Sequence, residues 1–366
     1  MSPELIPAAK PIIGDEERAA VDAVLRSGMI AQGPQVKAFE EEFSAQVAGG
    51  VECVAVNSGT SGLHLGLLAA GIGPGDEVIV PSFTFAATAN SVALTGATPV
   101  FADIERDFFC LDPESVRASI TERTKAIMPV HLYGHAANMP ALKAIADEFG
   151  LMLFEDAAQA HAAELDGRRV GTFGTFAMFS LYPTKNMTSG EGGMVSCATP
   201  EVARNVRLLR NQGMERQYAN EVIGFNARMT DIHAAIGRVQ LAKLEGWTET
   251  RRANAAFLDA NLEGVTVPKV AEGARHVYHQ YTIKVPADRD RIVAALREEY
   301  AVGSGVYYPI PNHRLQSLTH FAPGLDLPVT EECASQVISL PVHPSLTAAD
   351  LERIVTAVNA TVKAGA

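Results

Sequence analysis

Ser180-Leu-Tyr-Pro-Thr-Lys-Asn-Met-Thr-Ser-Gly-Glu-Gly-Gly193 is the part of this sequence that says most about its fold. An apolar, strand-like run at residues 175–181 leads into it, and a second apolar run, Met194–Cys197, follows it. Between these runs, proline and glycine interrupt regular structure and predict a loop that carries Lys185. Taken by itself, a lysine in such a loop is either an ordinary solvated side chain or a reactive amine.

The sequence before this loop alternates between strand-like and helical patterns. Helices are expected at Asp112–Ile120, where Asp112 caps and Pro113 fits the first turn, and at Asn138–Phe149. This alternation predicts a mainly parallel α/β sheet. The strands are compact apolar runs of the kind that is buried on both faces of a sheet, at residues 51–56, 77–81, 98–104, 125–130 and 151–154.

The C-terminal part predicts a second, smaller α+β domain. A helical tract at residues 231–262 is expected to bridge to it, followed by a strand at 281–285 and a helix at 289–299. A last helix is expected from about Ala348, opened by a capping box, Thr347-Ala-Ala-Asp350. Because 366 residues are too many for one simple core, we expect a large domain within residues 1–244 and a small domain at 245–366.

Composition narrows the possible functions. The formal net charge of −12 repels nucleic-acid phosphates and anionic lipids, so neither is expected as a partner. The four cysteines lie far apart, without the paired spacing of a metal site, and are expected to be reduced thiols. No apolar run approaches the roughly 20 residues of a membrane helix, and the first residues do not resemble a signal peptide. These features together predict a cytoplasmic protein without a metal ion.

Asp156 is placed to act together with Lys185. It follows the apolar run that ends at Phe154, and ligands of open α/β sheets bind at the carboxyl ends of strands. Pyridoxal phosphate needs such a pair: a lysine to form a Schiff base, and a carboxylate to keep the pyridine nitrogen protonated. The lysine must also titrate near pH 7–8 for acid–base work, well below its usual pKa of about 10.4. The alternative for Asp156 is an ordinary helix N-cap.

Residues 57–62, Asn-Ser-Gly-Thr-Ser-Gly, offer a cradle for the phosphate. They precede a helical pattern at residues 63–70, so backbone N–H groups and the hydroxyls of Thr60 and Ser61 suit a dianion. An ordinary Gly/Ser-rich turn is the alternative. Residues 71–75, Gly-Ile-Gly-Pro-Gly, superficially resemble a dinucleotide-binding loop, but they precede a strand and open no helix. We therefore interpret them as a turn.

Five motifs occur in order along the chain: Asn57-Ser-Gly-Thr-Ser61, Pro81-Ser-Phe-Thr-Phe85, Glu155-Asp-Ala-Ala-Gln159, Ser180-Leu-Tyr-Pro-Thr-Lys185 with Gly190-Glu-Gly-Gly193, and Gly224-Phe-Asn-Ala-Arg-Met-Thr-Asp231. In order and spacing they resemble the DegT/DnrJ/EryC1/StrS family of pyridoxal-phosphate-dependent sugar-nucleotide aminotransferases. The similarity extends from about Pro7 to the C-terminal helix. Two departures, Leu181 in place of Phe and Ser61 in place of Ala, remove no functional group. The resemblance implies a fold-type I aminotransferase and a homodimer whose subunits share both active sites.

The resemblance also implies roles for single residues. Lys185 matches the lysine that carries the cofactor, Asp156 the partner of the pyridine nitrogen, and Phe85 the aromatic residue that stacks on the ring. The alternatives from the residues alone are a core phenylalanine for Phe85 and a core or surface histidine for His313. The other implied contacts are Gln159 near the ring hydroxyl, Thr60, Ser61 and Ser180 at the phosphate, Asn226 at the phosphate of the other subunit, Arg228 at the anionic part of the substrate, and His313 on the sugar side.

The implied reaction is a ping-pong transamination from L-glutamate to a keto sugar carried on a nucleotide. The loop Asn186–Gly193 resembles the form frequent among relatives that make 4-amino sugars, so a 4-keto substrate is expected. A 3-keto sugar nucleotide and a cyclitol ketone are the alternatives. A related dehydratase would carry histidine at position 185, and a non-catalytic regulator would not need Lys185, Asp156 and Phe85 together.

Overall fold

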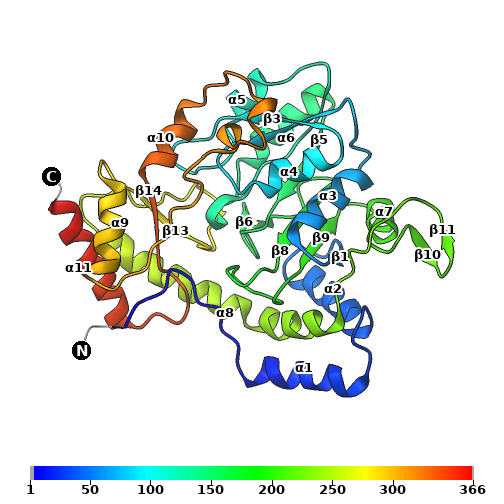
Figure 1. Cartoon of the computed structure of the whole chain (residues 1–366), viewed down its shortest axis with the longest axis horizontal. Coiled ribbons are helices and arrows are strands. Elements are labelled where there is room, and N and C mark those ends of the chain that lie inside the picture. The colour runs from blue at the N-terminus through cyan, green and yellow to red at the C-terminus, as the bar shows by residue number, and fades with distance from the viewer. Residues whose placement is uncertain (1–3, 365–366) are drawn as a thin grey trace.

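The computed structural model describes residues 4–364, and at its centre lies a seven-stranded sheet in the order β1-β9-β8-β5-β4-β2-β3 (Figure 1). Strands β3, β2, β4, β5 and β8 run parallel, whereas β9 pairs antiparallel with both β8 and β1. The predicted mainly parallel sheet is therefore confirmed. The strands are β1 (Glu52–Val56), β2 (Glu77–Pro81), β3 (Thr98–Ala102), β4 (Thr124–Ile127), β5 (Met152–Asp156), β8 (Phe176–Ser180) and β9 (Gly193–Cys197).

Both faces of this sheet are buried, as the apolar strand runs predicted. Successive residues of β8 alternate between two hydrophobic clusters: Phe176 and Met178 belong to one, and Ala177 and Phe179 to the other. This alternation follows from the two-residue period of a strand. The helices in the same part of the chain are α1 (Asp15–Ser27), α2 (Pro34–Gln46), α3 (Gly59–Ala69), α4 (Ala87–Leu94), α5 (Pro113–Ala118), α6 (Met139–Phe149) and α7 (Pro200–Arg210).

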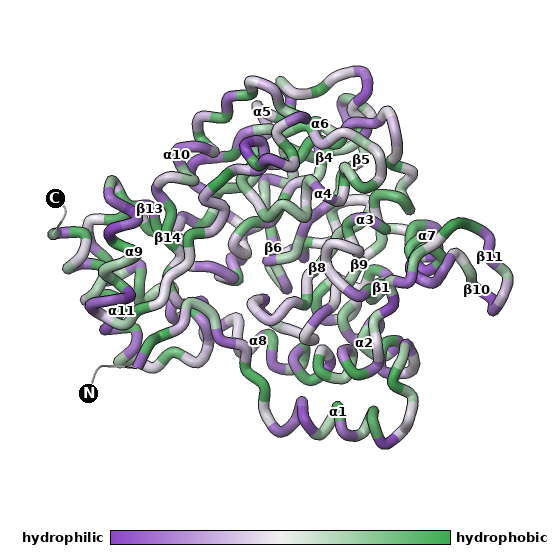
Figure 2. Tube along the Cα trace, viewed as in Figure 1, coloured by the Kyte–Doolittle hydropathy of each residue, from purple (hydrophilic) through white to green (hydrophobic). Residues whose placement is uncertain are grey.

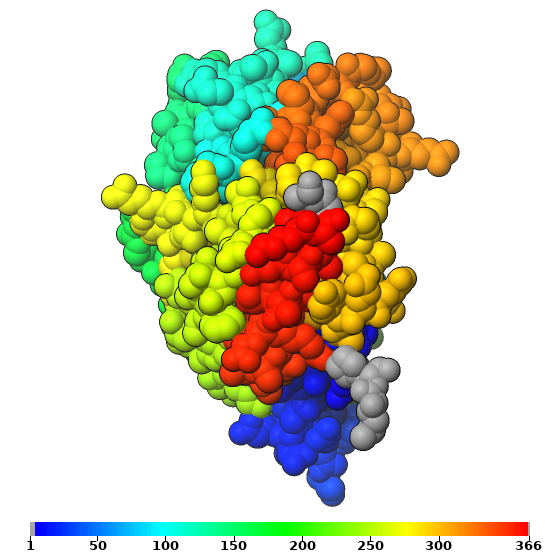
Figure 3. Space-filling view, turned by 90° about the vertical axis from the view of Figure 1, so that its left-hand side faces the viewer, coloured from blue at the N-terminus to red at the C-terminus, as the bar shows by residue number. Residues whose placement is uncertain are grey.

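A third hydrophobic cluster forms the C-terminal part, around β13 (Tyr281–Lys284) and its antiparallel partner β14 (Val337–Leu340). Two helices, α9 (Arg289–Glu298) and α11 (Ala348–Lys363), contribute to this cluster. Figure 3 shows α11, in red, lying along the surface beside the yellow-green α8. The predicted capping box at the start of α11 is confirmed, because Thr347 and Asp350 each accept the other's backbone N–H.

Helix α8 (Asp231–Asn261) connects the two parts of the chain. It packs against α1 and α2 at one end and against α11 at the other (Figure 1). The predicted domain boundary at residue 245 falls inside this helix and stays a prediction. The start of the chain also belongs to the C-terminal cluster, since Ile6 is buried there and exchanges backbone hydrogen bonds with Ala301 and Gly303 at 2.9 and 2.8 Å.

The remaining elements are short. Strands β10 and β11 form an outlying hairpin whose tip is coloured hydrophilic in Figure 2. No helix in the described part of the chain is long and apolar enough to cross a membrane. The short elements are η1 (Leu132–Gly134), β6 (Glu164–Leu165), β7 (Arg168–Arg169), β10 (Met214–Arg216), β11 (Ala219–Asn220), β12 (Ala274–Arg275), η2 (Asn312–Arg314), η3 (Thr319–Phe321) and α10 (Pro328–Gln336).

Candidate active site

Asp156 and Lys185 lie near each other at the carboxyl ends of two adjacent parallel strands. Asp156 is the last residue of β5, and Lys185 follows the end of β8 by five residues. Burial lowers the pKa of Lys185 to about 8, although the charge of Asp156 opposes this shift. Burial likewise raises the pKa of Asp156, against hydrogen bonds from Thr88 and Ala158 and the charge of Lys185. The site therefore holds a lysine whose amine is partly neutral near pH 8, beside a buried carboxyl group.

Two hydrogen bonds fix the carboxyl group of Asp156. The hydroxyl of Thr88, on α4, donates to Oδ2 at 2.8 Å, and the backbone N–H of Ala158 donates to Oδ1 at 3.1 Å. The segment after β5 consists of turns, so the interpretation of Asp156 as a helix N-cap is wrong. No pattern in the sequence singles out Thr88, which is 68 residues away along the chain.

The start of α3 and the end of β8 come together to form the proposed phosphate cradle. Helix α3 begins at Gly59, four residues before the expected start at residue 63. Its N-cap is Ser58, whose Oγ accepts the N–H of Ser61 at 3.1 Å. A Cβ atom on Gly59 would lie only 3.1 Å from the Cβ of Ser180, so glycine allows the close approach. The free N–H groups of a helix's first turn can hold a dianion in this space.

Phe85 and Gln159 differ in how firmly they are held. The side chain of Phe85 is 64% exposed, which rules out its alternative interpretation as a core residue. Gln159 is buried, with its Oε1 accepting the backbone N–H of Tyr133 and its Nε2 donating to the hydroxyl of Tyr308, both at 2.7 Å. Tyr308 comes from the C-terminal part of the chain and was not expected here. The residues provide an exposed aromatic face and a fixed amide, which fit an aromatic ring with a hydroxyl group.

Asn226 and Arg228 lie in an extended segment beside the end of β1. Arg228 forms a bridge with Val56, and its Nη1 donates to Oδ1 of Asn211 at 2.9 Å. Asn226 is exposed, so its side chain is free to face another molecule. Their expected contacts with the phosphate of another subunit and with the substrate stay predictions.

The placement of His313 argues against its expected contact with substrate. Its side chain is completely buried, and its Nδ1 and Nε2 lie 2.6 Å from Oγ of Ser82 and 3.1 Å from Oε1 of Glu331. Both ring nitrogens are thus engaged within the protein. The histidine joins the end of β2 to α10, and its motif was misleading because a buried histidine and a binding histidine look alike in sequence.

Glu155 holds the loop that leads into β8, a role that the sequence did not indicate. Its carboxylate accepts backbone N–H groups from Gly171, Phe173 and Gly174 at 2.6, 2.7 and 2.9 Å. It also lies 3.0 Å from Nε2 of His131, whose Nδ1 accepts the N–H of Ala137. This arrangement fixes the loop before β8 and therefore the strand that leads to Lys185.

The glycine turn after Lys185 is tightly packed. Gly190 and Gly192 have φ angles of 86° and 153°, and a Cβ on Gly192 would lie 2.6 Å from Met229. Glu191, between them, is exposed. Burial lowers the pKa of His233, at the start of α8, and the negative charge of Glu191 opposes this shift. The side chain of Glu191 thus faces away from the buried interior.

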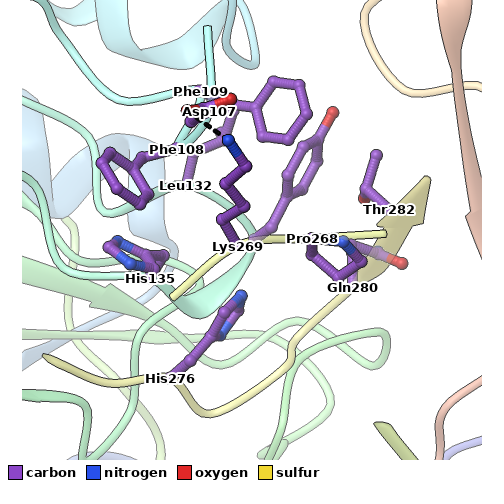
Figure 4. Close-up of a pocket in the computed structure, with 11 residues that line it drawn as sticks. Asp107, Phe108, Phe109, Leu132, His135, Pro268, Lys269, His276, Gln280 and Thr282 are labelled. Atoms are coloured by element: carbon purple, nitrogen blue, oxygen red, sulfur yellow. Dashed lines mark hydrogen bonds and ion pairs between the residues drawn. The ribbon is translucent and has the colours of Figure 1, made fainter. Parts of the chain in front are cut away.

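A separate cavity lies between the sheet domain and the segment before β13 (Figure 4). The lysine in this cavity forms an ion pair, because Nζ of Lys269 lies 2.7 Å from Oδ2 of Asp107. Burial lowers the pKa of His135 to about 4, so this imidazole is uncharged at neutral pH. None of the candidate cofactor or substrate residues lines this cavity.

The fold and the paired lysine and carboxylate define a pyridoxal-phosphate-dependent aminotransferase. A family model described as the DegT/DnrJ/EryC1/StrS aminotransferase family matches residues 11–359, and the chain belongs to this family. A UDP-N-acetyl-3-dehydro-alpha-D-glucosamine 3-aminotransferase of Acidithiobacillus ferrooxidans is 42% identical over 352 residues, which are 95% of this chain and 94% of that protein. A dTDP-3-amino-3,4,6-trideoxy-alpha-D-glucose transaminase of Streptomyces venezuelae is 42% identical over 348 residues, 94% of this chain and 91% of that one.

Solved structures agree with this assignment. The S. venezuelae enzyme DesV, in complex with a ketimine intermediate, superposes with a TM-score of 0.92 at 40% identity, covering 98% of this chain and 99% of that one. A sugar aminotransferase of Streptococcus pneumoniae in its PLP form superposes with a TM-score of 0.92 at 27% identity, covering 98% and 99%. The predicted fold, enzyme class and cofactor, pyridoxal 5'-phosphate, are confirmed.

Proposed function

We propose that this enzyme transfers the amino group of L-glutamate to a keto sugar linked to a nucleotide, by a ping-pong mechanism. The observation that supports this proposal most strongly is the Lys185–Asp156 pair at the carboxyl ends of β8 and β5. A hydrogen bond from Thr88 holds the carboxylate in place. One relative is named for a UDP-linked sugar and the other for a dTDP-linked sugar. These names support a sugar nucleotide as the amino acceptor. The nucleotide would supply binding energy remote from the reacting carbon, which positions the keto group.

Asp156 and Lys185 divide the chemical work. The hydrogen bonds from Thr88 and Ala158 favour the ionised form of Asp156, which would keep the proton on the pyridine nitrogen of the cofactor. When bound, the protonated ring supplies an electron sink for the carbon that loses its proton. Lys185, with a pKa of about 8, is suited to accept that proton and to return it in the second half of the reaction.

The remaining candidate residues would bind and orient the cofactor. We assign Thr60, Ser61 and Ser180 to the phosphate, because the start of α3 and the end of β8 adjoin there. Phe85 would cover one face of the ring, and the fixed amide of Gln159 would meet the ring hydroxyl.

We also propose a homodimer in which Asn226 and Arg228 serve the neighbouring site. Both belong to a surface segment that also carries exposed apolar side chains: Ile223 is 93% exposed and Phe225 is 39% exposed. Burial of such side chains against a second copy would be favourable. The four cysteines are buried free thiols, which suits the cytoplasmic location expected from the sequence.

Two positions on the sugar are candidates for amination. The loop Asn186–Gly193 favours a 4-keto substrate through its resemblance to relatives that make 4-amino sugars. A 3-keto substrate is favoured by the names of both relatives at 42% identity, which specify 3-amino chemistry. Matched 3-keto and 4-keto sugar nucleotides, offered with glutamate to the same enzyme, decide between them. Faster amination of the 3-keto compound would overturn the 4-keto proposal without affecting the transaminase assignment.

The proposed reaction is tested by colour. The purified, cofactor-loaded enzyme should be yellow and lose this absorbance when L-glutamate is added, with one equivalent of 2-oxoglutarate released per site. Addition of an accepted keto sugar nucleotide should then restore the colour. An enzyme that stays yellow with glutamate but responds to another amino acid would refute glutamate as the donor.

A further inference from the structure

The segment before α1 runs beside the loop that carries Lys185. Residues 8–13 have no regular structure and connect the buried Ile6, in the C-terminal cluster, to the start of α1 (Figure 1). Part of this segment lines a small cavity that Lys185 and Trp247 also line. The cavity has about 20 Å³ of space open to water, and one water molecule needs roughly 10–15 Å³. Between the segment and the lysine loop there is therefore room for a single water molecule.

One side chain ties this segment to the body of the protein. Gln240, in the middle of α8, donates from Nε2 to the backbone oxygen of Ile12 at 2.8 Å. Within the described residues 4–364, this is the only hydrogen bond that residues 8–13 form. The same Nε2 also donates to Oε1 of Glu17 at 2.7 Å, and both Gln240 and Glu17 are 1% exposed. The tether is thus a buried polar contact, whereas the segment that it holds lies at the surface.

The state of Lys185 depends on the exclusion of water. Burial lowers the pKa of Lys185 to about 8, although the charge of Asp156 opposes this shift. Burial acts in this direction because the ammonium form loses more hydration than the neutral amine. Ile12 and Trp247, both half-buried, present apolar surface to the cavity in place of water. Movement of the segment away from the cavity would admit water and favour the ammonium form again.

Other titratable groups also lie around the lysine. The charge of Lys185 acts on His161 and His279, but burial keeps both imidazoles uncharged, because it lowers the pKa of His161 to about 3 and that of His279 well below 6.5. Arg251 and Lys10 line the cavity as cations. Of these four groups only Lys10 belongs to the segment, so its charge has to be separated from the exclusion of water.

We propose that residues 10–12 shield Lys185 from bulk water, and that Gln240 is the positioning residue that holds them in place. The inference rests on the proposed role of Lys185 as the amine that carries the cofactor. Gln240 acts through the backbone of Ile12. The shield keeps part of the amine neutral and able to react, and it limits the water beside the reacting groups to about one molecule.

Gln240→Met tests the proposal, because methionine keeps the length of the side chain and removes both hydrogen bonds. The full-length chain without cofactor is mixed with pyridoxal phosphate across pH. The rate at which the yellow colour forms reports how much of the amine is neutral. In the wild type this rate should rise with a midpoint near pH 8. In Gln240→Met the midpoint should move roughly one unit higher, because a hydrated ammonium group loses its proton less readily. An unchanged midpoint would overturn the proposal.

Trp247 reports the position of the segment independently. It is the one tryptophan of the chain, it is half-buried, and it lines the same cavity. Quenching of its fluorescence by acrylamide should become roughly twofold stronger in Gln240→Met, because the released segment no longer covers the cavity. A shifted midpoint without stronger quenching would refute the idea that Gln240 acts through this segment.

Lys243→Met and Lys10→Gln are the matched controls. Lys243 donates to Oε1 of the same Glu17 at 2.9 Å, and its replacement leaves the bond to Ile12 in place. Lys10→Gln removes the charge of the segment and keeps its backbone. Both variants should keep the midpoint of the wild type. A shift equal to that of Gln240→Met would indicate general loosening around Glu17 in the first variant and a charge effect in the second. Either result refutes the shield.

Ile12→Ala decides the question if Gln240→Met does not fold, as judged by thermal unfolding. It shortens a half-buried side chain of the shield itself. We expect the midpoint to rise by roughly half a unit, and an unchanged midpoint overturns the proposal. Failure of the proposed role of Lys185 looks different, because Lys185→Ala would then turn yellow with pyridoxal phosphate as the wild type does.

Discussion

Replacement of Thr88 by valine should shift the pH dependence of catalysis without touching either reacting group. The hydroxyl of Thr88 donates to Oδ2 of the buried Asp156 at 2.8 Å, and valine keeps the shape but not the donor. A hydrogen bond to a charged group is worth about 1.5–3 kcal/mol, and one pKa unit corresponds to about 1.36 kcal/mol. The change should therefore raise the pKa of Asp156 further, by roughly one to two units.

The sign of the effect follows from which form of Asp156 is active. The ionised carboxylate is needed, so activity is lost as the pH falls through the pKa of Asp156. A raised pKa moves this acid limb to higher pH. The assay is the rate of colour loss with glutamate, measured across pH in the cofactor-loaded enzyme.

Thr361→Val is the control for this variant. Thr361 is also buried, but it lies in α11 and bonds only to carbonyl oxygens of its own helix. Thr361→Val removes a similar buried hydroxyl, and the pH profile of this variant should match that of the wild type. An acid limb that is the same in Thr88→Val and wild type would refute the idea that this hydroxyl tunes Asp156.

Three further outcomes are expected. Lys185→Ala should abolish turnover and keep the fold. Near-normal turnover would refute the assignment of Lys185 as the catalytic lysine. Asp156→Asn should lower the rate by several orders of magnitude, because an amide cannot hold the pyridine nitrogen protonated, and should cost little stability, because burial already disfavours the charged carboxylate. A rate within about tenfold of wild type would leave Asp156 without its proposed role. Mixed Lys185→Ala and Asn226→Ala subunits should regain activity beyond either mutant alone, since a hybrid dimer has one intact site; no recovery after proven subunit exchange would refute shared sites.

Local patterns in the sequence were sufficient for the sheet and for the central pair of the site. Strand β2 occupies the predicted residues Glu77–Pro81, and Asp112 caps α5 as expected, because burial on two faces and capping depend on nearby residues. Asp156 and Lys185 could be paired because both follow strands of one sheet.

Contacts between distant segments could not be predicted in the same way. Thr88 reaches Asp156 across 68 residues, and Tyr308 reaches Gln159 across 149. No local pattern distinguishes such residues from any other buried threonine or tyrosine. His313 shows the opposite error, because a motif suggested binding where the fold buries the ring between Ser82 and Glu331.

Helix α8 has a consequence for how the protein loses its structure. It is 31 residues long, about 46 Å at 1.5 Å per residue, and it is anchored at both ends. Near its start, Asp231 accepts the N–H groups of Gly33, Gln35 and Val36, and further along, Asn254 bonds the carbonyls of Val342 and His343. Because one continuous helix contributes to a cluster that packs on the sheet and to the C-terminal cluster, neither half can melt while the other stays intact. Heating should therefore produce a single calorimetric transition, and a fragment cut at residue 245 should fail to fold alone.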